Sequence, residues 1–149
     1  MPAPGDDGPV RQPRERRPDV IVGPAPDDPV PGVGTGAVRR TLTRSECLER
    51  LSAGGRGRVA ATMRAVPIIV PVTFVFEDEA VVFSTGRTEG LARAVANAVV
   101  VFECDDLWTS GDGLWGVHVT GVARVAGDPA AGPRFRLGSE YVSGWRVGD

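Results

Sequence analysis

The stretch RVAATMRAVPIIVPVTFVFEDEAVVFST, residues 58–85, decides the fold of this chain. Its β-branched and aromatic residues form three runs, which predict strands over 58–63, 68–76 and 80–85. Short polar segments separate the runs, so the strands are expected to pair as antiparallel hairpins. Pro71 interrupts the middle run. Because proline cannot donate a hydrogen bond to a neighbouring strand, we expect Pro71 at a sheet edge or a bulge.

One helix is predicted on each side of these strands. Thr43-Arg44-Ser45-Glu46 has the form of a capping box, and apolar residues at helical spacing follow it, which predicts a helix over 44–53. Gly54 ends that helix. Further apolar residues at helical spacing predict a second helix over 88–98.

The rest of the chain returns to strand patterns. We expect strands over 99–103 and 114–125, and a final strand or strand pair between Phe135 and Val147. The whole pattern is mainly β with flanking helices, and it predicts a small antiparallel β-barrel of about six strands. So small a barrel buries a modest core, which favours a symmetric homodimer.

The N-terminal segment has a different composition from the rest. Nine of the thirteen prolines fall between Pro2 and Pro31, with hardly any large apolar residue among them. Such a segment cannot bury enough surface to fold, so we expect a disordered tail over 1–38 and one domain over 39–149. Residues 32–37 loosely match a dinucleotide-binding glycine fingerprint. No strand can precede them after these prolines, so we interpret them as linker.

Charge and cysteine content narrow the function classes. The net charge is −2, which gives no global basic field for nucleic acid or an anionic membrane. All seventeen basic residues are arginines, so any phosphate must be held by arginine, hydroxyls or backbone amides. Cys47 and Cys104 are far apart, and we interpret them as small buried hydrophobes in a reducing compartment. No apolar leader or membrane-length run is present, so we expect a cytoplasmic protein.

Six sequence segments together carry a family resemblance. In chain order they are Leu42–Leu48 with Gly57–Val59, Pro67–Phe74, Val82–Gly86, Val101–Glu103 with Asp105-Asp106, Trp115–Ala123, and Val142–Arg146. Their order and spacing resemble the pyridoxamine 5'-phosphate oxidase-like FMN-binding split barrels. Within that family the chain is most similar to the nitroimidazole-resistance-type branch.

The resemblance implies a split β-barrel that binds FMN at a homodimer interface. It implies an FMN-dependent oxidoreductase acting on a small, unidentified substrate of, for example, the nitroaromatic kind. The flavin ring would lie along the second strand and its phosphate on the loop after the third. The residues that match the family's cofactor site are Val72, Thr73, Phe74, Ser84, Thr85, Gly86, Arg87, Thr88 and Trp115.

The chemistry of the loop after the third strand suits a phosphate. Hydroxyls at 84, 85 and 88 can donate hydrogen bonds, Gly86 allows close backbone approach, and Arg87 supplies a bidentate cation. The alternative is an ordinary polar turn capped by Thr88. For Trp115, stacking on a planar ligand and packing in the barrel interior remain equally open.

Some features leave other functions open. The family often has Lys or Arg where this chain has Gly90, and the stretch between 126 and 134 is short. The alternatives are a deazaflavin-dependent reductase of the same fold, a protein that holds flavin, haem or tetrapyrrole without turnover, and a degenerate member that binds nothing. His118 is the only histidine and would be the haem ligand. No Ser/His/Asp set or metal cluster can be assembled, because one histidine cannot supply both. Catalytic residues therefore stay unassigned, and no metal is expected.

Overall fold

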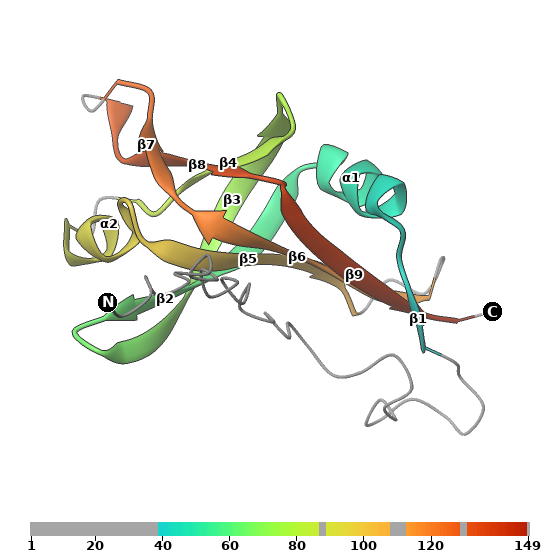
Figure 1. Cartoon of the computed structure of the whole chain (residues 1–149). Coiled ribbons are helices and arrows are strands. Elements are labelled where there is room, and N and C mark those ends of the chain that lie inside the picture. The colour runs from blue at the N-terminus through green and yellow to red at the C-terminus, as the bar shows by residue number, and fades with distance from the viewer. Residues whose placement is uncertain (1–38, 87–88, 108–112, 129–130, 149) are drawn as a thin grey trace, which may run out of the picture.

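A computed structural model describes residues 39–86, 89–107, 113–128 and 131–148 (Figure 1). The predicted tail, 1–38, and its glycine motif lie outside the described residues. The elements in chain order are β1 (Arg39–Thr41), α1 (Arg44–Ser52), β2 (Gly55–Met63), β3 (Val66–Glu77), β4 (Ala80–Ser84), α2 (Glu89–Val95), β5 (Val99–Asp106), β6 (Leu114–Val122), β7 (Arg124–Ala126), β8 (Arg134–Gly138) and β9 (Tyr141–Val147).

The nine strands form one antiparallel sheet in the order β1-β9-β6-β5-β2-β3-β4-β8-β7. From β6 to β8 the sheet curves round a core until these two strands pack against each other. Gly121 of β6 lies beside Leu137 of β8, and no ladder joins these two strands where the chain is described. The barrel is therefore split, as the resemblance implied, and β9, β1 and β7 extend it beyond the closure.

The core follows from the alternation of side chains along the strands. One face of the barrel strands lines the core and carries the large aromatic residues, and in β4 residues 80–83 are buried on both faces. Phe74 meets Phe102 edge to face, with ring centroids 4.7 Å apart, and Phe83 lies 5.6 Å from Phe135. These rings fill the centre of the barrel, so every residue one position away along a strand lies on the outer face.

Helix α1 covers one end of the barrel (Figure 1). Its predicted capping box is present: the amide of Glu46 donates to the Thr43 side chain, and Glu46 accepts from the Thr43 amide at 2.8 Å. A hydrogen bond from Arg40, followed by that from Thr43, lowers the pKa of Glu46 to about 2. Cys47 and Leu51 form the buried side of the helix.

The structure corrects two details of the sequence interpretation. The sheet has nine strands rather than about six, because short strands at both ends, β1 and β7, and separate strands β8 and β9 extend it. The second helix ends before the predicted residue 98: α2 is described from Glu89 to Val95, and Asn97 follows it with a φ of 57°, a left-handed conformation that ends a helix.

Both cysteines are free and buried, as predicted. Burial, reinforced by neighbouring acidic groups, raises the pKa of Cys104 to about 12, so its thiol is unreactive. In the described part of the chain, neither helix is long and apolar enough to cross a membrane.

Candidate functional site

The meander β2–β3–β4 builds the candidate site. A two-residue turn at Arg64 and Ala65, both at positive φ, joins β2 to β3 and fixes their register. This register places Arg56 opposite Thr73, and the next hairpin places Thr73 opposite Ser84. One row on the outer face of three adjacent strands therefore carries a cation and two hydroxyls.

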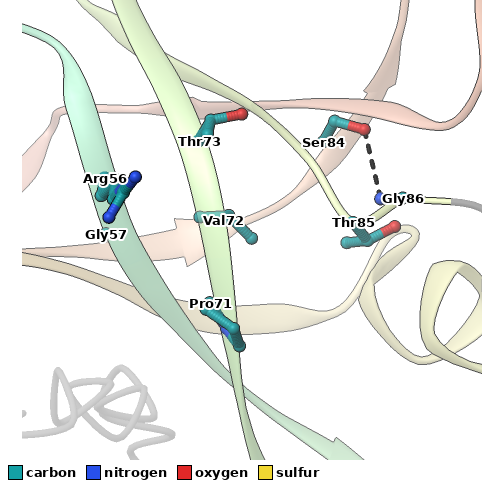
Figure 2. A pocket seen from close by; sticks show the side chains of 8 residues that line it. All are labelled: Arg56, Gly57, Pro71, Val72, Thr73, Ser84, Thr85 and Gly86. Atoms are coloured by element: carbon teal, nitrogen blue, oxygen red, sulfur yellow. Dashed lines mark hydrogen bonds between the residues drawn. The ribbon is translucent and has the colours of Figure 1, made fainter.

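A cavity of about 560 Å³ lies along this row (Figure 2). Its walls come from the start of β2, the middle of β3, and the end of β4 with the loop that follows. The lining residues are Arg56, Gly57, Pro71, Val72, Thr73, Ser84, Thr85 and Gly86. Pro71 lies in the half of β3 that pairs with β2 alone, which is the edge position predicted for it.

Thr85 is the most informative residue of the cavity. Its side chain is 8% exposed, and its hydroxyl Oγ1 has no hydrogen-bond partner among the described residues. An unpartnered buried hydroxyl is uncommon in native structures and calls for an explanation, such as a bound ligand atom. Beside it, the amide of Gly86 donates to Ser84 Oγ at 3.3 Å, which fixes the loop (Figure 2).

Arg56 is the one charged side chain among the described residues that line the cavity. It is exposed and pairs with no carboxylate of the described residues. Gly86 has a φ of 71° with nothing near its missing Cβ, so its backbone is open to the cavity. Hydroxyls, an open backbone and an unpaired guanidinium are a donor set for an oxyanion such as phosphate.

The structure brings together five of the predicted site residues: Val72, Thr73, Ser84, Thr85 and Gly86 all line the cavity. Phe74 and Trp115 are not among the lining residues. Phe74 points into the core, where it is 5% exposed. Trp115 packs against the core under Arg50, whose guanidinium lies 4.6 Å from the ring centroid. Arg87 and Thr88 lie outside the described residues.

The sequence interpretation missed Arg56 and Arg134 as site residues. Arg134 of β8 is the cross-strand partner of Ser84, so it continues the outer row by one more strand. Together with Thr73 and Ser84 it lines a second cavity of about 270 Å³. Both residues are recognised only from the pairing of the strands. Arg56 is opposite Thr73, and Arg134, although fifty positions from Ser84 in the sequence, is opposite Ser84.

His118 lies beside a carboxylate of the neighbouring strand. Register across β5 and β6 brings it to Glu103, whose Oε1 lies 3.2 Å from Nε2. Arg58 approaches both Glu103, at 3.2 Å, and Asp105. The contact with His118, supported by Arg58, holds the pKa of Glu103 below its usual value. This network is on the outer face and contributes nothing to the lining of the cavity.

No group of three or more His, Cys, Asp and Glu side chains within the described ranges is arranged to hold a metal ion.

Comparison with known proteins shows a family match and a shared fold. Residues 43–137 match the model of the pyridoxamine 5'-phosphate oxidase family. An uncharacterized protein of Mycobacterium tuberculosis is 35% identical over 100 residues, which cover 64% of this chain and 66% of that protein. The chain therefore matches just under two thirds of this curated relative.

Two solved structures have the same architecture. An FAD-binding protein from Mycobacterium smegmatis is 31% identical, with a TM-score of 0.63, and the match covers 73% of this chain and 98% of that one. An FAD-binding protein from Mesorhizobium loti is 24% identical, with a TM-score of 0.62, and the match covers 76% and 100% of the two chains. The second likeness concerns the fold alone.

Proposed function

This chain belongs to the pyridoxamine 5'-phosphate oxidase family, and from that membership we propose that it is a flavin-dependent oxidoreductase acting on a small molecule. The family fold binds flavins, and the relative of known structure with 31% identity is an FAD-binding protein. FMN is the smallest phosphorylated flavin that would use the donors of the β2–β3–β4 cavity.

The buried hydroxyl of Thr85 is the observation that carries this proposal. A side chain that is 8% exposed and has no partner in the described chain fits a ligand acceptor atom that completes its hydrogen bonding. Arg56 supplies the opposing charge from the other side of the cavity, with Thr73 and Ser84 between them. These residues fit the phosphate of a flavin.

In this arrangement the chain's own residues bind and orient. The hydroxyls of Thr85 and Ser84 would hold the phosphate, and Arg56 would neutralise it. The strand segment Pro71–Thr73 would lie along the remainder of the ligand and offer it backbone groups. When bound, a flavin supplies hydride and electron transfer, and the protein contributes position and electrostatics.

Thr85→Val tests the proposal through two opposite effects. Valine has the same shape without the hydroxyl, so the free energy of unfolding of the ligand-free protein is expected to stay the same or rise by up to about 1 kcal/mol. FMN binding is expected to weaken by about tenfold, because one phosphate hydrogen bond is lost. Chemical denaturation and FMN titration measure the two quantities. Unchanged FMN affinity, or no FMN binding by wild type, contradicts the proposal.

We also propose that a second copy of this chain covers the outer face of β3, β2, β5, β6 and β9. Register aligns Ile69, Ala60, Val101, Thr120 and Tyr141 in one row across these strands. Ile69 is 70% exposed and Tyr141 67%, and Val99 beside the row is 69% exposed. Exposed apolar side chains gathered on one face are typical of an interface. Arg56, Pro71 and Thr73 are on the same face, so the partner would border the cavity.

Ile69→Asp is expected to convert the dimer into a monomer, because it places a charge in the apolar row. Sedimentation velocity at micromolar concentration measures the change. Glu79→Gln, at the exposed turn between β3 and β4, is the matched control and should remain dimeric. A monomeric wild-type protein would refute the dimer.

A further inference from the structure

A third cavity, of about 290 Å³, lies between α2 and the hairpin of β7 and β8. Register places Val125 opposite Phe135, which belongs to the buried core, so both lie on the core face of the hairpin. Arg134 also borders the cavity, but it alternates with Phe135 along β8, and its side chain is on the outer face with Ser84. The cavity is therefore on the opposite side of β8 from the phosphate site.

Small side chains leave this space open. Ala92 and Ala96, one helical turn apart, line it from α2, and Ala126 and Gly132 line it from the hairpin. A Cβ at Gly132 would meet nothing within 4 Å. Val125 is 58% exposed, although its strand position puts it on the core face. Part of the apolar core side is thus left without a covering side chain.

Hydrogen bonds fix both walls of the cavity. After α2, the Asn97 amide donates to the Ala123 carbonyl at 2.8 Å, and the Ala123 amide donates to the Ala98 carbonyl at 2.9 Å. Arg124 donates to Asn97 Oδ1 at 3.1 Å. The opposite wall is held because β8 pairs with both β4 and β7. The cavity is therefore formed before any ligand binds, as most small-molecule sites are.

Arg93 provides a charge beside these apolar groups. It lies on the same side of α2 as Ala92 and Ala96, and it lines the cavity. It is exposed, and no carboxylate pairs with it among the described residues. No acidic side chain is among the lining residues in the described part of the chain. An unpaired guanidinium beside an apolar wall complements a ligand that has an anionic head and an apolar body.

We propose that this cavity binds a small monocarboxylate, with its carboxylate on Arg93 and its apolar body against Val125 and Ala96. The two oxygens of a carboxylate match two donors of one guanidinium. Ligand sites begin at about 300 Å³, and this cavity is near that limit, so its ligand has a short alkyl chain or a single ring. The proposal does not depend on the flavin function.

Calorimetric titration of the full chain with octanoate, 1-octanol and acetate tests the two halves of this ligand. Wild type is expected to bind octanoate at least about tenfold more tightly than 1-octanol, which lacks the charge, or acetate, which lacks the chain. Arg93→Gln should weaken octanoate binding by about tenfold and leave 1-octanol binding unchanged. Ala96→Phe fills the cavity and should abolish the binding of both.

Arg64→Asn is the matched control, because it removes the same charge at the turn between β2 and β3. It should bind octanoate as wild type does. Thermal unfolding shows whether Ala96→Phe is folded. If it is not, Val125→Asp takes its place, since this exposed position tolerates a polar group. It should weaken octanoate binding by about tenfold or more, because it puts a carboxylate in the wall.

Three results would each overturn the site: equal affinity of wild type for octanoate and 1-octanol, normal octanoate binding by Arg93→Gln, or normal octanoate binding by the folded cavity variant. FMN titration of the same proteins tests the flavin function separately, because the two sites share no binding residue assigned above.

Discussion

Replacing Arg56 with glutamine is expected to weaken FMN binding by about one to two decades and to leave riboflavin binding unchanged. Arg56 is the one described cation that lines the first cavity, and it has no carboxylate partner among the described residues. A charged hydrogen bond is worth about 1.5–3 kcal/mol, and each 1.4 kcal/mol is about tenfold in affinity. Riboflavin has no phosphate, so it does not report this interaction. Fluorescence titration with both ligands measures the difference.

Arg64→Asn is the control for charge alone. Arg64 is at the far end of the same hairpin with a φ of 50°, a conformation that asparagine tolerates. It should bind FMN as wild type does.

The sequence motif instead predicts that Arg87 holds the phosphate, and Arg87→Ala tests that prediction in the same titration. If Arg56→Gln binds FMN normally and Arg87→Ala does not, the charge comes from the loop after β4.

Gly57→Ala is expected to lower the free energy of unfolding by about 1–3 kcal/mol, the usual cost of overpacking a core. A Cβ at this position would lie 2.5 Å from Phe102 Cε2 and 2.6 Å from the carbonyl oxygen of Glu103. The carbonyl belongs to the paired strand β5, so β2 and β5 would have to separate. Urea denaturation of the ligand-free protein measures the loss.

The matched control is Gly90→Ala, in helix α2. Its Cβ would have ordinary contact with Met63 Sδ at 3.9 Å, and alanine favours helix by about 1 kcal/mol over glycine. This variant should be as stable as wild type or more so. A second variant, Phe102→Leu combined with Gly57→Ala, should recover part of the loss if the clash with the ring is its cause. Equal stability of Gly57→Ala and wild type would disprove the clash.

The sequence allowed prediction of the elements that depend on local signals. The capping box at Thr43 and Glu46 fixed the start of α1, because it satisfies backbone groups within one turn. The runs of β-branched and aromatic residues in 58–85, separated by short polar segments, predicted β2, β3 and β4, since the hairpins between these strands are short. Short edge strands such as β1 and β7 carry too few residues for an alternation, and they exist only because β9 and β8 offer them pairing edges.

The site residues that are consecutive in the sequence were predicted, and those that neighbouring strands contribute were missed. Ser84, Thr85 and Gly86 are consecutive, and a motif can identify them. Arg56 could have been found from the two-residue turn at Arg64 and Ala65, since that turn fixes which residue of β2 faces Thr73. Arg134 required the pairing of β4 with β8, which no local pattern encodes. The same holds for Glu103 beside His118.

The unpartnered hydroxyl of Thr85 has an evolutionary consequence. In relatives that no longer bind a phosphate, no ligand offsets the free-energy cost of burying this unpartnered hydroxyl. Substitution by valine or alanine then leaves the stability of the fold unchanged or raises it. The residue at this position then separates cofactor-dependent relatives from degenerate ones that keep the barrel alone. We expect purified relatives with valine here to carry no flavin absorbance, and relatives with threonine to retain it.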